Sequence, residues 1–118
     1  MPTAVVTTTV KHMTELGLHV LLAIGDGAAH GYAIGKDVED RSGGRLDPTT
    51  GALYQVLKRL QQDGLIQPVP PPGGTPVDAR RRYFALTARG RDAVTAEIGR
   101  LNDVVQLAKR RRLFRGAR

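Results

Sequence analysis

Polar and basic side chains gather, without an acid, along one segment of the chain at the spacing of a helix face. The segment is DPTTGALYQVLKRLQQDG, residues 47–64. Its polar positions are Thr49, Thr50, Tyr54, Gln55, Lys58, Arg59, Gln61 and Gln62, and no acid lies between Asp47 and Asp63. Surface helices usually alternate acids with bases, whereas hydrogen-bonding and cationic groups together suit phosphates and base edges. The pattern therefore indicates a helix that contacts nucleic acid.

The same segment carries its own helix signals. Asp47 is expected to cap the helix, Pro48 suits the first helical position, and Gly64 can adopt the left-handed conformation that ends a helix. The buried stripe is predicted to be Leu53, Val56, Leu57 and Leu60. Two readings stay open for the polar face. Tyr54 can be a half-buried aromatic residue or a DNA contact, and Arg59 can be solvated.

Composition limits the classes of protein that the chain can belong to. With 118 residues and 41% hydrophobic content, the chain can form one domain around one modest core. No apolar run is long enough to span a bilayer, and the start MPTAVVTTTVKH lacks the order of a secretory signal. We therefore expect a cytoplasmic protein with no membrane partner. The absence of cysteine excludes disulfides, thiolate nucleophiles and cysteine metal sites.

The positive charge is concentrated at the end of the chain. The net charge is +7, and the last ten residues, KRRRLFRGAR, carry six positive charges and no acid. This tail can extend a DNA footprint, touch acidic lipids or form a solvated end. The preceding 108 residues are close to neutral, so a basic patch on the folded body must be local.

Two helices are expected before the segment described first. One begins after Thr14 and buries Leu18, Leu21, Leu22 and Ile24, and residues 25–27 end it with turn chemistry. The other runs over residues 31–40, is ended by residues 42–44 and is followed by a very short extended piece at residues 45–46. Residues 1–12 are expected to form an N-terminal arm. Three helices of which the last has an acid-poor face match a helix-turn-helix.

A β-hairpin is expected after the third helix. Residues 65–67 are expected to form a short strand that Pro68 either confines to a sheet edge or ends outright. Strand formers resume at residues 82–86 after the loop PPPGGTPVDA. A helix-turn-helix followed by a hairpin is a winged helix. Arg80, Arg81 and Arg82 at the strand edge are expected to meet phosphates, with one of them paired to an acid of its own domain because alternation sends Arg81 to the opposite face.

The last helix is expected to pair two copies of the chain. Thr87 can cap it, while Gly90 and Gly99 each weaken it by roughly 1 kcal/mol relative to alanine. Its apolar stripe comprises Val94, Ile98, Leu101, Val104, Val105 and Ala108. A marginal helix with a broad apolar face needs a partner, and a second copy gives a two-fold homodimer. The expected organisation is an arm at 1–12, a winged helix-turn-helix domain at 13–87, a dimerisation helix at 88–112 and a basic tail at 113–118.

Catalytic and metal sites are not expected. Ser42 is the only serine, and it lies in a Ser-Gly-Gly turn rather than in a nucleophile motif. Residues 31–36 have the wrong spacing for a phosphate-binding loop. His12, His19 and His30 share no metal-ligand spacing, so His19 is expected to be structural and His30 a local hydrogen-bonding group. The chain is therefore expected to be neither an enzyme nor a cofactor protein.

Three motifs in this order resemble the PadR family of bacterial transcriptional regulators. They are HGYAI at residues 30–34, TTGALYQVLKRLQQDGLI at 49–66 and RRRYFALTARGR at 80–91. The resemblance covers residues 16–91 and the helix beyond, and the single C-terminal helix is similar to that of the small subfamily, whose members are homodimers. It implies a mainly α fold with a small β-hairpin, a winged helix-turn-helix plus a long C-terminal dimerisation helix.

The resemblance also implies a function and a set of contacts. It implies a repressor that binds a palindromic operator in double-stranded DNA and responds to a ligand or a stress, with a small-molecule effector at the dimer interface. The implied contacts are Thr49, Thr50, Gly51, Tyr54, Gln55 and Lys58 for DNA bases or backbone, Tyr32 for phosphate, and the arginines at 80–82 in the wing. Gln55 departs from the family pattern, in which proline is frequent there. The chain has no tryptophan for aromatic sandwiching of a drug.

Two other classes remain as alternatives. A winged helix can serve as a protein-interaction module, with the apolar last helix docked on a different chain. A regulator of another winged-helix family, such as the MarR type, is a second alternative, although that type needs extra helices at both ends.

Overall fold

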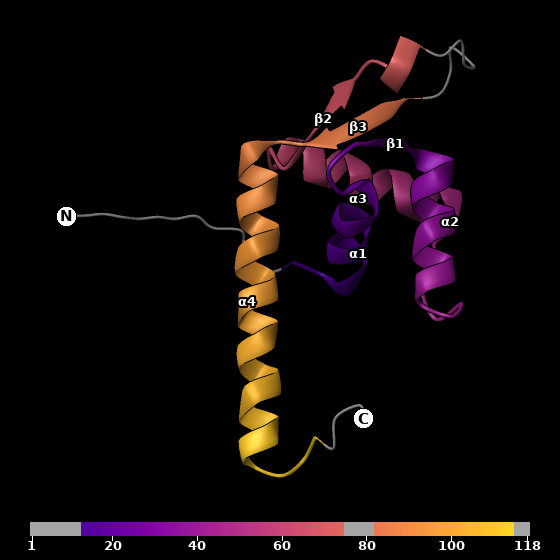
Figure 1. The fold of residues 1–118 in the computed structure, drawn as a ribbon. Helices are drawn as coiled ribbons and strands as arrows, with labels where there is room; N and C mark the ends of the chain where they lie inside the picture. Colours follow the sequence, from indigo (N-terminus) through magenta and orange to yellow (C-terminus); the bar gives the residue numbers. More distant parts are fainter. Residues whose placement is uncertain (1–12, 75–81, 115–118) are drawn as a thin grey trace, which may run out of the picture.

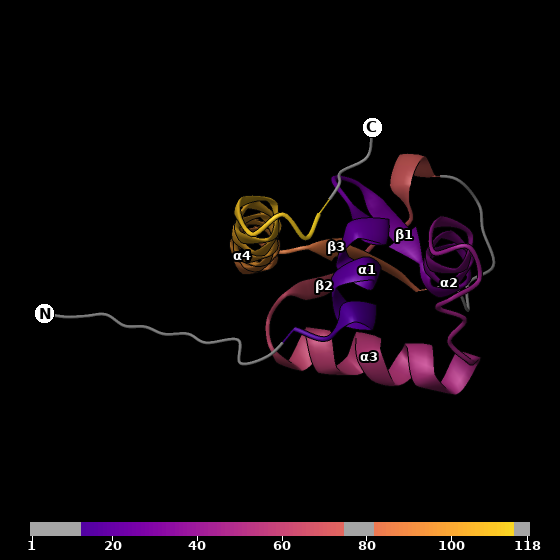
Figure 2. The same ribbon diagram turned by 90° about the horizontal axis from the view of Figure 1, so that it is seen from below.

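A computed structural model describes residues 13–74 and 82–114. The elements in chain order are α1 (Glu15–Ile24), β1 (Ala28–His30), α2 (Gly31–Arg41), α3 (Thr50–Gln62), β2 (Ile66–Val69), the 3-10 helix η2 (Pro72–Gly74), β3 (Tyr83–Leu86) and α4 (Ala88–Arg110). In both views α1 lies between α2 and α4 (Figures 1 and 2), and Figure 1 shows that α4 extends well past the body. The structure is mainly helical with a small antiparallel sheet and a long C-terminal helix, so the predicted winged helix-turn-helix fold is confirmed.

The core forms where the three helices meet the hairpin. Its buried residues are Val20, Leu21, Ile24, Ile34, Val38, Leu53, Leu57, Leu60, Leu65, Ile66 and Phe84. The predicted stripe of α3 is therefore buried, with Val56 partly buried against the core. Leu22 departs from the prediction, because it is exposed on α1. Gly35 lets α2 and α3 approach closely, since a Cβ there would lie 3.2 Å from Leu53 Cδ2.

The sheet has a strand that the sequence did not predict. Its order is β1-β3-β2, with both pairings antiparallel and with Ala29 and Pro68 both opposite Phe84. β1 is only Ala28–His30, and alanine is a weak strand former, so no local signal marked it. The extended piece expected at residues 45–46 is not a strand. Pro68 lies in an edge strand, as predicted.

The start of α3 differs from the prediction, whereas its end agrees. Thr49 is the N-cap, because its hydroxyl accepts a hydrogen bond from the Ala52 amide at 3.0 Å. Asp47 lies two residues before the cap position, and Pro48 precedes the helix. At the other end Gly64 has φ +78°, and the Leu65 amide donates to the Leu60 carbonyl at 2.9 Å, which closes a Schellman turn.

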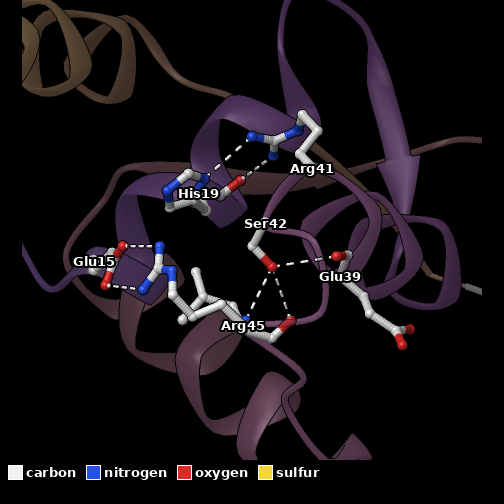
Figure 3. A network of polar contacts seen from close by, with 7 residues as sticks. Glu15, His19, Glu39, Arg41, Ser42 and Arg45 are labelled. Atoms are coloured by element: carbon white, nitrogen blue, oxygen red, sulfur yellow. Dashed lines mark hydrogen bonds and ion pairs between the residues drawn. The ribbon is translucent and has the colours of Figure 1, made fainter.

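A polar network joins α1 to the turn after α2 (Figure 3). The Arg45 guanidinium makes a two-pronged ion pair with Glu15. Arg41 donates to the His19 carbonyl at 3.0 Å, lies 3.1 Å from His19 Nδ1 and pairs with Asp37 at 2.7 Å. His19 is thus a structural residue, as expected. Arg41 connects α1 to the last turn of α2.

The Ser42 hydroxyl closes the turn after α2 with backbone partners alone. It accepts from the Leu46 amide at 2.9 Å and lies within donating distance of the Glu39 and Leu46 carbonyls. The only serine of the chain therefore serves as a turn residue, which leaves it no role as a nucleophile.

α4 begins as predicted, with Thr87 as its N-cap and a 2.9 Å hydrogen bond from the Gly90 amide to the Thr87 hydroxyl. Ala93 and Val94 pack against the core. Further along, the stripe leaves the body. Ile98, Val104, Val105 and Leu107 are exposed, and Leu101 and Ala108 are half-buried. Within the described ranges, no helix is long and apolar enough to cross a membrane.

Candidate nucleic-acid interface

The outer face of α3 is polar and exposed. Gly51, Gln55 and Lys58 lie opposite the buried stripe, because they follow one another at intervals of four and three residues. Thr50 and Tyr54 flank them on one side, and all these positions are exposed. Thr49 is exposed immediately before the helix, and its hydroxyl oxygen is already used as the cap. The predicted residues of the third helix are therefore brought together on one surface.

The cations of this face have no acidic partner among the residues that the structure describes. Among residues 13–74 and 82–114, the ion pairs are Lys36–Asp40, Arg41–Asp37, Arg45–Glu15, Arg91–Asp26 and Arg100–Glu97. None of these pairs includes Lys58 or Arg59. Lys36 and Arg41 on α2 are thus paired with acids, as are Arg91 and Arg100 on α4. Lys58 and Arg59 on α3 have no acidic partner among the described residues and stay available to an external anion.

Tyr54 connects α3 to the first turn of α2. Its side chain is 45% exposed, and a Cβ at Gly31 would overlap its hydroxyl and lie 2.8 Å from its Cζ. Tyr54 is therefore exposed overall while its hydroxyl end packs against Gly31. Gly31 was not singled out from the sequence. The sequence did contain a signal for this contact, because a glycine within a helix often marks close packing against a neighbouring group.

The first turn of α2 presents a second exposed aromatic residue. Tyr32 is 71% exposed. His30 caps this helix, since its Nδ1 accepts from the Ala33 amide at 3.4 Å, and its ring meets Tyr83 edge-on at 5.2 Å. The local hydrogen-bonding role expected for His30 is confirmed. Free amides at the positive end of α2 and the two tyrosines together form a surface suited to a phosphate.

Gly51 has no packing role that accounts for it. It lies inside α3 and is exposed, and a Cβ added there would meet nothing within 4 Å. Glycine in a helix costs up to about 1 kcal/mol relative to alanine. Since no contact of the described chain requires this glycine, it fits a surface that a ligand approaches closely.

The wing is described only in part. The β2–β3 hairpin extends past the body on the side away from α4 (Figure 1). Arg82 is exposed immediately before β3. Arg80 and Arg81 lie outside the described residues, as do the arm at 1–12 and the end of the basic tail. The expected ion pair of one wing arginine therefore stays a prediction.

One carboxyl near the helix-turn-helix has a shifted pKa. The hydrogen bonds from Arg45 hold the pKa of Glu15 below its ordinary value of 4.5. This pair joins α1 to the turn before α3 and belongs to the scaffold rather than to the exposed face of α3. No group of three or more metal-ligating side chains occurs in the part of the chain that the structure describes.

Fold and surface together define a winged-helix protein whose third helix presents an open polar face. The family model of PadR-like transcriptional regulators matches residues 20–96. The chain therefore belongs to the PadR-like family, whose members are regulators of transcription rather than enzymes.

One relative in sequence and several solved structures are similar to this chain. A 37.1 kDa protein of transposon TN4556 from Streptomyces fradiae is 42% identical over 78 residues, which are 66% of this chain and 20% of that protein. The chain thus spans about a fifth of the length of that relative. A PadR-like regulator from Bacillus cereus has a similar fold, with a TM-score of 0.68, 19% identity, and 86% and 93% of the two chains covered.

A third comparison is with a protein bound to its target. The structure of Bacillus subtilis PadR in complex with operator DNA has a TM-score of 0.58 and 22% identity, and covers 70% of this chain and 46% of that one. At this identity the likeness establishes the fold alone.

Proposed function

We propose that the protein is a cytoplasmic, homodimeric repressor that binds a palindromic operator in double-stranded DNA. The observation that carries this proposal is the outer face of α3, which combines exposed polar groups, unpaired cations and a glycine that nothing in the described chain requires. Family membership and the fold shared with an operator-bound PadR support it. α3 enters the major groove, where its side chains meet base edges and phosphates.

Each candidate residue has a part in this arrangement. Gly51 admits the DNA backbone or a base edge to the helix, Gln55 presents an amide to the bases and Lys58 neutralises a phosphate. Thr49 and Thr50 lie at the entry of α3 into the groove. Tyr54 and Tyr32 flank the first turn of α2, where they hold a phosphate against the positive helix end. Arg80, Arg81 and Arg82 contact the phosphates from the wing.

The exposed stripe of α4 is the dimer interface. Val104 is 53% exposed in a single chain, and Ile98, Val105 and Leu107 extend the same apolar surface. Leu101 and Ala108 lie along it, and Val94 anchors the start of the helix to its own core. Two recognition helices presented by one two-fold axis match a palindromic site. A small-molecule effector binds between the α4 helices and releases the operator.

Selection of DNA by the purified protein tests this function. Duplexes retained from a random library are sequenced, and the affinity for the selected duplex is then measured across a salt series. Lys58→Ala is expected to weaken DNA binding several-fold. The slope of log affinity against log salt concentration should fall by about 1, the value for one lost phosphate contact. Lys36→Ala is the matched control, because it removes the same charge from a lysine already paired with Asp40.

Gly51→Ala gives a sharper signature, because stability and affinity move in opposite directions. The substitution is expected to raise helix stability by up to about 1 kcal/mol while lowering DNA affinity. Recovery of no duplex above background, or an unchanged affinity in both Lys58→Ala and Gly51→Ala, would overturn the proposed function.

A further inference from the structure

The first turn of α4 is hydrogen-bonded to the end of α3 through three consecutive backbone carbonyls. Arg89 Nε donates to the Asp63 carbonyl at 2.9 Å. The Thr87 hydroxyl donates to the Gly64 carbonyl at 2.6 Å, and the Thr87 amide donates to the Leu65 carbonyl at 3.1 Å. The chain leaves α3 at these residues, so the last backbone groups of α3 and the first of α4 form one connected unit, the α3–α4 joint.

Gly90 brings the two backbones into direct contact. It is buried, and a Cβ there would overlap the Leu65 carbonyl oxygen and lie 3.0 Å from the carbonyl carbon. Both groups are backbone, so neither can rotate away. The sequence suggested only that Gly90 weakens its helix. The structure shows that this glycine is required by the packing, whereas Gly99 in the same helix faces open space.

The joint is rigid because it contains little side-chain freedom. The Schellman turn fixes Gly64 at a positive φ, and the Arg89 side chain lies against that glycine, with Cδ 3.5 Å from the position of a Cβ. The Thr87 oxygen also accepts from the Gly90 amide at 2.9 Å, so it is fixed on both sides. The direction of α4 relative to α3 is therefore set by the backbone contact at Gly90 and by the hydrogen bonds of Thr87 and Arg89 to backbone carbonyls.

We propose that this joint sets the spacing and tilt of the two recognition helices in the dimer, with Gly90, Thr87 and Arg89 as its positioning residues. The inference rests on the proposed function, in which α4 pairs two chains and α3 meets DNA. With the two α4 helices held together, each α3 can take only the position that its joint allows. A change in the packing of α4 is passed to α3 through the same contacts.

The size of the effect follows from the length of α3. Thirteen residues span about 20 Å at 1.5 Å per residue. A tilt of about 10° at the joint moves the far end of α3 by roughly 3 Å, and two-fold symmetry doubles the change between the two helices. Half-sites one helical turn apart require a separation near 34 Å, so such a change misaligns both helices with their grooves.

Distance measurements on Gly90→Ala test the joint. The chain has no cysteine, so cysteines placed at two exposed positions, Ala52 near the far end of α3 and Gln106 on α4, take spin labels without interference. Labelled chain is diluted with unlabelled chain so that only the distance within one chain is measured. Gly90→Ala is expected to shift or broaden this distance by several ångströms and to lower the affinity for the selected duplex at least tenfold, while sedimentation still shows a dimer.

Gly99→Ala is the matched control, since it makes the same change in the same helix at a position with no neighbour. It is expected to leave the distance and the affinity unchanged. If Gly90→Ala fails to fold, Thr87→Val and Thr87→Ser replace it. Valine removes the hydroxyl bonds and is expected to broaden the distance, whereas serine keeps them and is expected to restore it.

The outcomes separate the joint from the proposed function and from a purely stabilising role. A lower melting temperature with an unchanged distance distribution would overturn the inference, because it would show that the joint adds stability without positioning α3. If the wild-type chain selects no duplex, the proposed function fails, and the α3–α4 distance alone still decides whether the joint positions the helix.

Discussion

α3 and α4 carry the same sequence pattern in different surroundings. Each starts with a threonine that caps the amide three residues later, and each has an apolar stripe at helical spacing. The stripe of α3 is buried within the chain, with Leu57 only 2% exposed. The start of the α4 stripe packs against the core, and from Ile98 onward most of the stripe is exposed to solvent. Periodicity therefore predicts that a helix has an apolar face, but not whether the same chain covers it.

The two helices also differ in how the cations on their polar faces are paired. On α4, Arg91 and Arg100 are each paired with an acid. On α3, Lys58 and Arg59 have no such partner among the described residues. The difference is one of degree, because Arg89, Lys109 and Arg110 of α4 also lack an acidic partner among the described residues. α4 leaves an apolar stripe exposed, whereas α3 buries its stripe and exposes mainly polar and cationic groups, which is the division expected when α4 meets a second copy and α3 meets an anion.

Val105→Glu is expected to have the largest effect. It places a charge in the proposed interface twice per dimer, and an unpaired buried charge costs several kcal/mol. We expect a folded monomer by sedimentation and loss of operator binding. Gln106→Glu, at the neighbouring position on the outward face, is expected to remain dimeric. A stable Val105→Glu dimer would show that another surface pairs the chains.

Leu57→Ala tests the difference between the buried stripe of α3 and the exposed stripe of α4. Removing this buried side chain is expected to cost about 2–5 kcal/mol of unfolding free energy. The loss should persist at protein concentrations low enough to dissociate the dimer. Val104→Ala is the counterpart on α4, and its cost should disappear on dissociation. An equal cost at all concentrations for Val104→Ala would place that residue in the monomer core.

Thr49→Ala tests which residue starts α3. Loss of the cap is expected to cost about 1 kcal/mol of unfolding free energy, measured in urea. Asp47→Ala is the control, because this residue lies before the cap position, and its effect should be close to zero. A larger loss at Asp47 than at Thr49 would restore the start that the sequence suggested.

Glu15→Gln is expected to have the smallest effect, and its sign depends on pH. The folded-state pKa of Glu15 is lowered by Arg45, so the pair stabilises the fold above the ordinary pKa of 4.5 and loses this contribution as pH falls through the folded value. The variant should be slightly less stable than wild type at pH 7, and the difference in unfolding free energy should shrink as pH falls below 4.5. Glu39→Gln serves as the control, and a difference that grows toward low pH would contradict the assignment.

The fold could be predicted largely because its signals are local. Thr14, Thr87 and Gly64 end or start helices through groups within four residues, and the structure confirms all three. The features that were missed depend on residues distant in sequence. β1 forms because β3 supplies its hydrogen-bonding partner. Glycine is required at position 31 because the Tyr54 side chain lies against it, and at position 90 because the Leu65 carbonyl does.

The candidate site divides in the same way. The polar face of α3 followed from spacing alone, and its residues do share one exposed surface. The sequence did not identify Thr49 rather than Asp47 as the N-cap of α3. The cap position depends on the conformation of the turn between α2 and α3. That turn is held by Ser42 and by the Arg45–Glu15 pair, contacts that no local pattern reveals.

The position of β3 in the sheet has a consequence for how the chain acquires its structure. β3 is the middle strand, and its partner β1 comes from the first third of the chain, so pairing of Ala28 with Ala85 encloses α2, α3 and the wing in one long loop. Contacts between residues so far apart in sequence form late and slowly. A ribosome must therefore release the chain through β3 before the helices ahead of it can settle into their final packing. The helix-turn-helix and the wing form one cooperative folding unit, and a fragment that ends after α3 would lack the strand that closes it.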